Sequence, residues 1–464
     1  MLFNSAAFLL IFLPLTLIAY WLVDRHERLR IAVLLSFSLA FYGLWNPEFV
    51  PLMVGLIVLN WAAARWYARV QDGRIVTMAI IATLGVLAIY KYADFLINSF
   101  SALTGVPPRH LGLGLGLGLP VGISFFTFHH IMYLIDLRRG RADQAPLDRY
   151  ALYISFYPQA AAGPLARWSE IGAQLGQSAF RDGWERRWAI AITFVVIGLV
   201  EKVALGDPIG QLINPTFQAA TAGPVLDGSA WLSLAFGFQI YFDFAGYSNM
   251  AIGIALLFGV RLPENFHAPF RAPSIIAFWQ RWHMTLSRFL RDYVFLPLAD
   301  MRIAGTRHTT AQYVMAILTT MALCGLWHGA GWNFVLWGLL HGVAIVVALG
   351  WRRAGVRLPR LLGWALTVSF FLLSGILFRT TSLDHAWNLF VGLAVLPEPK
   401  LLGKAWIIGI GAACACLLPA SRIICEKLTE RPLAIVPVVC GIICVAIMVQ
   451  LGADQSYEFI YFRF

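Results

Sequence analysis

Apolar residues dominate the chain in long runs that short polar segments separate. A helix needs roughly 20 mainly apolar residues to cross the hydrocarbon core of a membrane. Runs of this kind recur along the whole chain: Ala6–Val23, Ile31–Trp45, Val50–Ala64, Ile75–Tyr90, Trp188–Val200, Gln312–Trp327, Trp332–Leu349, Leu361–Phe378, Ala405–Leu418 and Leu433–Leu451. The pattern predicts an all-α polytopic membrane protein with about ten to thirteen crossings.

Composition agrees with this class, because 59% of the 464 residues are hydrophobic and only 13% are charged. The first run lacks a basic leader and a small-residue cleavage site, so we expect a retained helix and not a signal peptide. Basic residues follow the first, third and fifth runs: Arg25, Arg28, Arg30, Arg65, Arg69, Arg74, Arg138, Arg139, Arg141 and Arg149. The positive-inside rule therefore places these loops in the cytoplasm and the N-terminus outside.

The net charge of +11 raises the possibility of a nucleic-acid partner. The arginines are spread among short loops, however, and form no single basic domain. Membrane topology explains most of the charge, and we expect no nucleic-acid binding. The six cysteines show no paired CxxC spacing, so neither a zinc site nor a disulfide framework is indicated.

Two apolar segments are unusual. The run LGLGLGLG at Leu111–Gly118 resembles a phosphate-binding loop, but no lysine follows it, so we favour a tightly packed or irregular membrane segment. The segment FYPQAAAGPLARW at Phe156–Trp168 holds two prolines and several small residues. Irregular backbone survives at membrane depth only where protein or water satisfies it. We expect a re-entrant or cavity-lining segment there.

The section Arg261–Arg307 carries seven arginines interleaved with aromatic residues, so it is no simple crossing. With Ser274 as N-cap, a helix from Ile275 to Tyr293 would bear an apolar stripe and an opposite basic face. This pattern predicts one helix lying along or dipping into the membrane interface. His283 would lie at the edge of the apolar stripe and face the protein interior.

The segment Phe238–Leu298, which contains IYFDFAGYSN and FWQRWHMTLSRFLRDY, resembles the signature region of bacterial membrane-bound O-acyltransferases, the MBOAT family. The alginate O-acetyltransferase branch is the most similar group. Further matching pieces follow in family order: LPVGISFFTFHHIMYLIDLRRG, FYPQAAAGPLARW, GLWHGAGWNFVLWGLLHG, ILFRTTSLDHA and the terminal FIYF. The resemblance implies a single membrane domain over residues 1–464, with N-terminal helices to 110, a core at 119–350 and C-terminal helices from 351.

The resemblance also implies acyl transfer from a cytoplasmic thioester, expected to be acetyl-coenzyme A, toward O-acetylation of an exopolysaccharide such as alginate or cellulose. No tightly bound cofactor is expected. The implied partners are membrane lipids and separate periplasmic acetyltransferases or polysaccharide-synthesis proteins, and the implied location is the bacterial inner membrane. Two alternatives stay open, a transporter or flippase and a non-catalytic scaffold. The halves of the chain show no convincing inverted repeat, which favours an enzyme.

His328, in CGLWHGAGWNF, occupies the position of the family's central catalytic histidine, and His283 matches its second histidine. A buried, neutral imidazole could take the proton that an acceptor hydroxyl must lose to attack a thioester. The alternative for His328 is a structural bond to a neighbouring helix, and for His283 interfacial packing beside Trp282. Trp282, Trp327, Asn333 and His341 are expected to support them. If Gly325–Leu349 were one straight helix, His341 would lie roughly 20 Å from His328, but the glycines in this segment could break the helix, so His341 is expected to have a secondary part.

Asp243 lies among apolar residues and needs a partner, for which we expect an arginine, a histidine or channel backbone. Structural support is at least as plausible for it as direct chemistry. Arg281, Arg288 and Arg291 could bind the coenzyme's phosphates, and anionic lipid headgroups are an equal alternative. His129 and His130 are adjacent and no HExxH motif occurs, so no metal site is expected.

Overall fold

The computed structural model describes residues 2–106, 118–300, 309–397, 399–430 and 443. Helices make up its regular structure, and no strand occurs in these ranges. The chain divides into two compact units, Met1–Val196 with Tyr247–Pro263 and Leu428–Glu458, and Ile197–Gly246 with Glu264–Lys427 and Phe459–Phe464. The prediction of a single domain stays a prediction. The LGLGLGLG run up to Leu117, the apolar run from Leu433 and the terminal FIYF lie outside the described residues.

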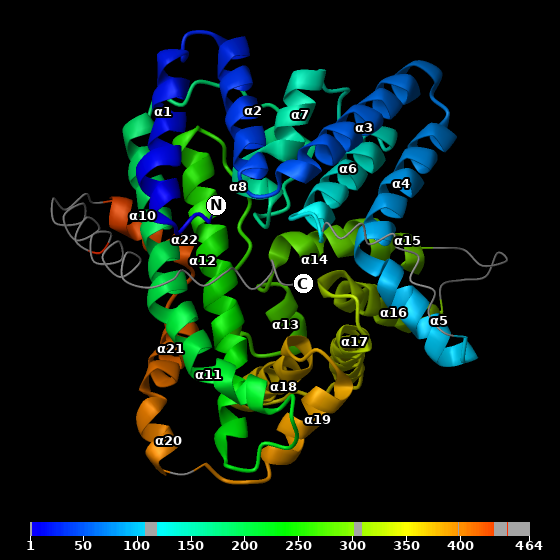
Figure 1. The fold of residues 1–464 in the computed structure, drawn as a ribbon, viewed down its shortest axis with the longest axis vertical. Coiled ribbons are helices and arrows are strands. Elements are labelled where there is room, and N and C mark those ends of the chain that lie inside the picture. Colours follow the sequence, from blue (N-terminus) through cyan, green and yellow to red (C-terminus); the bar gives the residue numbers. More distant parts are fainter. Residues whose placement is uncertain (1, 107–117, 301–308, 398, 431–442, 444–464) are drawn as a thin grey trace. The chain divides into compact units, whose positions relative to one another are not determined.

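The first unit is built from the N-terminal helices (Figure 1). Its elements are the π-helical turn η1 (Phe8–Phe12), α1 (Leu13–Leu22), α2 (Glu27–Gly43), the 3₁₀ turn η2 (Pro47–Phe49), α3 (Val50–Val70), α4 (Gly73–Leu87), the π-helical turn η3 (Ala88–Tyr92), α5 (Ala93–Thr104), α6 (Ile123–Arg138), α7 (Leu147–Ser155), α8 (Tyr157–Ala160), α9 (Trp168–Ile171) and most of α10 (Trp184–Leu199). Helices α3, α4 and α6 pack against one another, as do α2 and α7.

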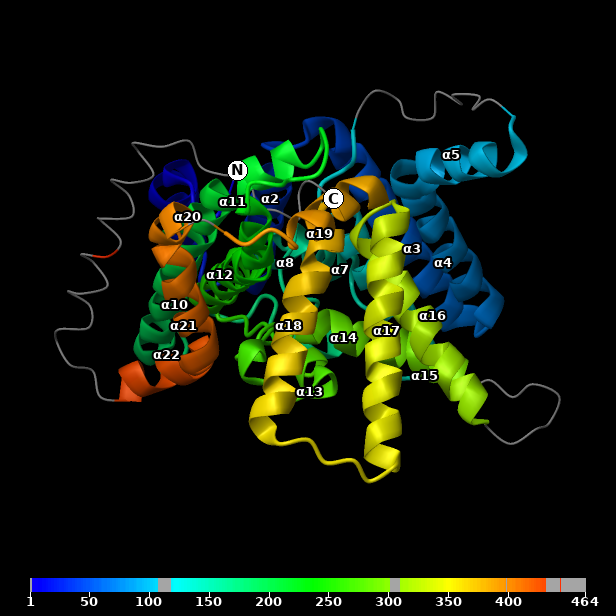
Figure 2. The ribbon, with the colours of Figure 1, turned by 90° about the horizontal axis from the view of Figure 1, so that it is seen from below.

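The second unit continues from the π-helical turn η4 (Val200–Gly206). Its further elements are α11 (Asp207–Ala219), the 3₁₀ turns η5 (Ser229–Ala235) and η6 (Pro269–Arg271), the first half of α12 (Phe236–Leu257), α13 (Ile275–Trp279), α14 (Met284–Leu290), the π-helical turn η7 (Arg291–Phe295), α15 (Leu296–Ala299), α16 (Thr310–His328), α17 (Trp332–Arg353), α18 (Arg360–Arg379), α19 (Leu383–Gly392), α20 (Pro399–Lys404), α21 (Trp406–Leu417) and most of α22 (Ser421–Glu430). Figure 2 shows α17 beside both α16 and α18, which it contacts.

Seven helical segments of the described chain are long and apolar enough to cross a membrane. They are Pro47–Val70, Gly73–Thr104, Trp184–Ala219, Ser229–Leu257, Thr310–His328, Trp332–Arg353 and Arg360–Arg379. The pair Trp406–Leu417 and Ser421–Thr429, bent by 73°, makes an eighth if it counts as one span. Helix α2 and the Phe8–Leu22 segment are shorter, which accounts for part of the difference from the ten to thirteen expected crossings.

The segment Phe156–Trp168 has the irregular backbone that its prolines predict. Helix α7 ends at Ser155, the single turn α8 follows, and no helix is formed again until α9 begins at Trp168. Residues 156–166 are all buried. Protein atoms therefore cover this backbone, as the sequence predicts for a segment that is not a plain crossing.

Candidate active site

His328 is the last residue of α16, at a sharp reversal of the chain. The turn Gly329–Gly331 follows, and α17 starts at Trp332. The two helices then run side by side because glycines let their backbones meet: a Cβ on Gly325 would overlap the carbonyl of Phe334, and one on Gly338 the carbonyl of Met321. The glycines around His328 thus serve close helix packing, which is one of the uses glycine has.

Aromatic rings enclose the His328 imidazole, which is 3% exposed. Its ring centroid lies 4.6 Å from Trp327, 4.8 Å from Phe378 and 5.4 Å from Trp337. A small pocket of about 20 Å³ adjoins it. The residues that line this pocket are Phe236, Gly237, Ile240, Trp282, His328, Trp337, Phe371, Gly375 and Phe378. Apart from His328, no lining residue carries an ionisable group.

His283 lies in a break between two helices, which corrects the prediction of one helix from Ile275 to Tyr293. Ser274 caps α13 as expected, since its side chain accepts a hydrogen bond from the Ala277 amide. The helix nevertheless ends at Trp279, and α14 starts at Met284. His283 between them has φ +40°, in the left-handed region that side chains rarely adopt. The break turns His283 inward, where it is 1% exposed.

The Asn265 side chain determines which ring nitrogen of His283 carries the proton. Asn265 Oδ1 lies 2.9 Å from His283 Nδ1 and also accepts from Thr285 Oγ1 at 2.9 Å. A carbonyl oxygen only accepts, so Nδ1 carries the proton and Nε2 has the lone pair. Along the chain, His283 lies outside the membrane-spanning segments, after α12 and before α16. Burial of its side chain lowers its pKa to about 3. The imidazole is therefore neutral at physiological pH, and the lone pair of Nε2 can accept a hydrogen bond.

Trp327 connects the two histidines. Its ring centroid lies 5.9 Å from that of His283 and 4.6 Å from that of His328. Trp282, the neighbour of His283, lines the pocket at His328 and packs against Phe371 at 4.8 Å. The structure thus brings together His283, His328 and both tryptophans predicted to support them.

His341 is close to His328, contrary to the separation that a straight helix would give. The reversal at Gly329–Gly331 places Trp337 between them, 5.4 Å from His328 and 4.5 Å from His341. Trp279 Nε1 donates to His341 Nδ1 at 3.3 Å, so the proton is on Nε2, which donates to Ser374 Oγ at 3.0 Å. Both nitrogens of His341 are engaged, which fits a positioning role.

Asn333 ties the start of α17 to the end of α18. Its Nδ2 donates to the carbonyls of Leu377 at 3.1 Å and Thr380 at 2.7 Å. Carbonyls at the C-terminal end of a helix have no backbone N–H partner within the helix, and the Leu377 carbonyl also accepts from Thr380 Oγ1 at 3.3 Å. Asn333 therefore supports the site by fixing the turn that carries His328.

Asp243 pairs with a lysine, a partner that the expectation of an arginine, a histidine or channel backbone did not include. Lys202 Nζ lies 2.5 Å from an Asp243 carboxylate oxygen and 2.6 Å from Asp207. Both Lys202 and Asp243 are 3% exposed as side chains. This ion pair joins η4 to α12, where a Cβ on Gly206 would lie 3.1 Å from the Asp243 amide nitrogen. It supports the structural interpretation of Asp243.

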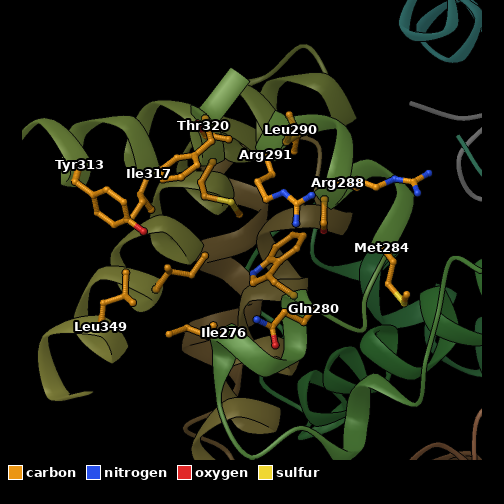
Figure 3. A pocket seen from close by; sticks show the side chains of 15 residues that line it. Ile276, Gln280, Met284, Arg288, Leu290, Arg291, Tyr313, Ile317, Thr320 and Leu349 are labelled. Atoms are coloured by element: carbon orange, nitrogen blue, oxygen red, sulfur yellow. The ribbon is translucent and has the colours of Figure 1, made fainter. Parts of the chain in front are cut away.

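A larger cavity of about 460 Å³ lies between α13, α14, η7, α16 and α17. Arg288 and Arg291 line it, and Arg281 is not among its lining residues. In Figure 3 Arg291 extends toward the middle of the cavity and Arg288 to its side. Arg291 Nε also pairs with Asp292 at 2.7 Å. The remaining lining residues are mostly apolar. One of them, Trp279, has its ring centroid 6.0 Å from that of Trp337, which lines the His328 pocket.

Metal binding finds no support in the part of the chain that the structure describes, where no group of three or more His, Cys, Asp and Glu side chains could hold an ion. The described cysteines, Cys324, Cys414, Cys416 and Cys425, form no disulfide in the described part of the chain, and they are buried or half-buried, as packing residues would be. Cys440 and Cys444 lie outside the described residues.

Sequence reasoning missed Asn265 and Ser374, which orient two of the histidines. Asn265 precedes His283 by 18 residues and Ser374 follows His341 by 33, so no local spacing links either pair. The left-handed backbone at His283 had no glycine to indicate it. Only the tertiary fold brings these groups together.

Comparison with known proteins gives a consistent result. The MBOAT, membrane-bound O-acyltransferase family profile matches residues 123–371. The chain is 34% identical over 436 residues to a peptidoglycan O-acetyltransferase of Helicobacter pylori, covering 85% of this chain and 80% of that protein. It is 36% identical over 410 residues to a probable alginate O-acetylase, AlgI, of Azotobacter vinelandii, covering 85% and 78%. A teichoic acid D-alanyltransferase of Streptococcus thermophilus is 30% identical over 240 residues, covering 50% and 57%.

Proposed function

The chain belongs to the membrane-bound O-acyltransferase family and is a multi-pass membrane acyltransferase, and we propose that its acyl group is acetyl and its final acceptor an exopolysaccharide. The donor in this proposal is acetyl-coenzyme A on the cytoplasmic side of the bacterial inner membrane. Relatives named for O-acetylation of peptidoglycan and alginate support acetyl as the group and a glycan as the acceptor. Alginate and cellulose are both suitable glycans.

The observation that carries the proposal is the buried His328 imidazole beside a small pocket, with His283 one ring away. An alcohol attacks a thioester slowly until its proton is being removed. In the proposed step His328 takes the hydroxyl proton, the acceptor oxygen bonds to the acyl carbon, and the carbon–sulfur bond breaks. The proton then passes to the departing thiolate, which leaves as the thiol. The apolar surroundings exclude water that would hydrolyse the donor.

His283 assists in this proposal through Nε2, because Asn265 already holds Nδ1–H. A second hydroxyl of the acceptor, donating to Nε2, would hold the acceptor in place while His328 removes the proton from the attacking hydroxyl. Asn333, Trp282, Trp327 and His341 keep the two imidazoles in place, and Asp243 holds the helix behind them through Lys202.

The 460 Å³ cavity is the proposed entry for the donor. Guanidinium groups bind phosphate oxygens well, and Arg288 and Arg291 stand at this cavity while its other walls suit an apolar pantetheine arm. Arg281 does not line this cavity, and in the proposal it binds the headgroups of anionic membrane lipids. Periplasmic acetyltransferases or polysaccharide-synthesis proteins would carry the acetyl group onward to the glycan.

Acetyl ester content of the exopolysaccharide tests this function in cells. A host lacking the gene receives wild type, His328→Ala or His26→Ala, with equal amounts of protein confirmed in the membrane fraction. His26 is exposed and serves as the matched histidine control. We expect acetyl esters with wild type and His26→Ala and none with His328→Ala. Equal acetylation by His328→Ala, or no acetyl ester with wild type, contradicts the proposal.

A further inference from the structure

The pocket at His328 is very small for an acyltransferase site. Its volume of about 20 Å³ compares with the roughly 10–15 Å³ that a cavity needs to hold one water molecule. A methyl group is of that order of size, whereas a chain of several methylenes is not. If acyl transfer takes place at His328, as proposed above, the acyl group must fit here.

We propose that this pocket limits the acyl group to two carbons, and that Ile240 and Gly375 set the limit. The inference rests on the proposed function and adds the specificity of the site. Both residues line the pocket, Ile240 from α12 and Gly375 from α18.

The remaining walls are aromatic rings that hold one another in place. The ring centroid of Phe378 lies 5.1 Å from that of Trp337 and 4.8 Å from that of His328. The ring centroid of Phe371 lies 4.8 Å from that of Trp282. Rings packed on several sides do not move aside cheaply, because well-packed interiors resist added volume. A longer acyl group therefore cannot make room by displacing the rings.

The two glycines of the pocket differ in what faces them. A Cβ on Gly237 would lie 2.5 Å from Leu372 Cδ2, so packed side chains already occupy the space there. A Cβ on Gly375 would lie 3.4 Å from Phe236 Cδ1, an ordinary contact, and 4.0 Å from the Gly237 amide nitrogen. Gly375 thus leaves open a space of about one methyl group, which a larger residue would fill without a clash.

Ile240 is the complementary position, where a smaller residue would enlarge the pocket. It is 4% exposed and lies on the α12 face that lines the pocket. Shortening it to valine removes one methylene, and shortening it to alanine removes three carbons. An apolar pocket without room for one more methylene discriminates by roughly 10- to 200-fold.

Competition between acyl donors tests the limit. Purified protein with partner fractions receives equimolar acetyl-, butyryl- and hexanoyl-coenzyme A, and the ratio of acylated products is measured. We expect wild type to favour acetyl over butyryl by at least about tenfold. The butyryl-to-acetyl ratio should rise from wild type to Ile240→Val to Ile240→Ala. If alanine impairs folding, as judged by elution profile, the valine variant carries the test.

Gly375→Ala should lower acetyl transfer at least about tenfold while the protein elutes as wild type does. Gly409→Ala, at an exposed position of α21 with nothing near its added Cβ, is the matched control and should transfer acetyl normally. Equal transfer of acetyl and butyryl by wild type, or no change of ratio in the Ile240 variants, overturns the size limit but leaves the proposed function. Absence of transfer from every donor by wild type overturns the proposed function itself.

Discussion

Hydrogen bonds assign different roles to the buried histidines of the second unit. Both nitrogens of His341 are bonded, to Trp279 and Ser374, so its lone pair is already used. His283 is bonded only at Nδ1, and its buried Nε2 has no hydrogen-bond partner among the described residues. A buried acceptor without a partner is costly, which is typical of a group that a substrate satisfies. His283 therefore suits contact with the acceptor, and His341 suits positioning.

Asn265→Ala tests the bond that sets His283. The substitution leaves the Nδ1–H of His283 without its acceptor, and burying an unsatisfied donor costs about 1–3 kcal/mol. We expect the free energy of unfolding in detergent to fall by that amount and acyl transfer to fall with it, because Nε2 is no longer held in one orientation. Unchanged activity and stability would show that Asn265 does not orient the imidazole.

At the scale of elements, two chain breaks build the site, and neither follows from periodicity. The sequence from Ser274 to Tyr293 correctly predicted the Ser274 cap and a buried apolar face. The single continuous helix was wrong, because the chain leaves the helical conformation at Gln280–His283. The tertiary bonds of Asn265 to His283 and Thr285 stabilise the break, and they are long-range in sequence. The glycines at 329 and 331 did hint at the second break, which reverses α16 into α17.

The identities of the central residues were predictable and their partners were not. His328, His283, Trp282 and Trp327 lie close together, and the resemblance to the family's motifs had singled out the two histidines, which the apolar pattern alone does not assign a role. The Asp243 partner, a lysine from η4, depends on which helix packs beside α12, and a single sequence does not contain that information.

Gly338→Ala tests the close packing of α16 and α17. The added methyl would overlap the Met321 carbonyl, so the helices must separate, and overpacking of this kind costs about 1–3 kcal/mol. We expect lower thermal stability and weaker acyl transfer, because His328 sits at the end of this contact. Gly350→Ala in the same helix is the control, since nothing lies within 4 Å of its added Cβ. Equal behaviour of the two variants would mean that the contact does not hold the site.

For the molecule as a whole, the arginine loops of the first unit predict its orientation. Arg141 follows α6 and Glu48 precedes α3, on opposite ends of their helices, and both are exposed. The positive-inside rule places Arg141 in the cytoplasm and Glu48 outside. Of these two positions, only Arg141 would lie in the cytoplasm, the compartment of the proposed donor.

Labelling with a membrane-impermeant maleimide checks this orientation. In intact spheroplasts Glu48→Cys should be labelled and Arg141→Cys should not, whereas permeabilised membranes should expose both. The wild-type protein gives the background from its native cysteines. The reverse pattern would place the arginine loops outside and contradict a cytoplasmic donor entering from that side.

The most direct test of the account is transfer of radiolabelled acetyl from acetyl-coenzyme A by the purified protein with partner fractions. Wild type, His328→Ala and the exposed control His26→Ala are compared after their elution profiles are matched. Loss of a catalytic base lowers rates by about 10²- to 10⁴-fold. We predict such a loss for His328→Ala and normal transfer by His26→Ala. A folded His328→Ala protein that transfers label at the wild-type rate would contradict the assignment of His328 as the base.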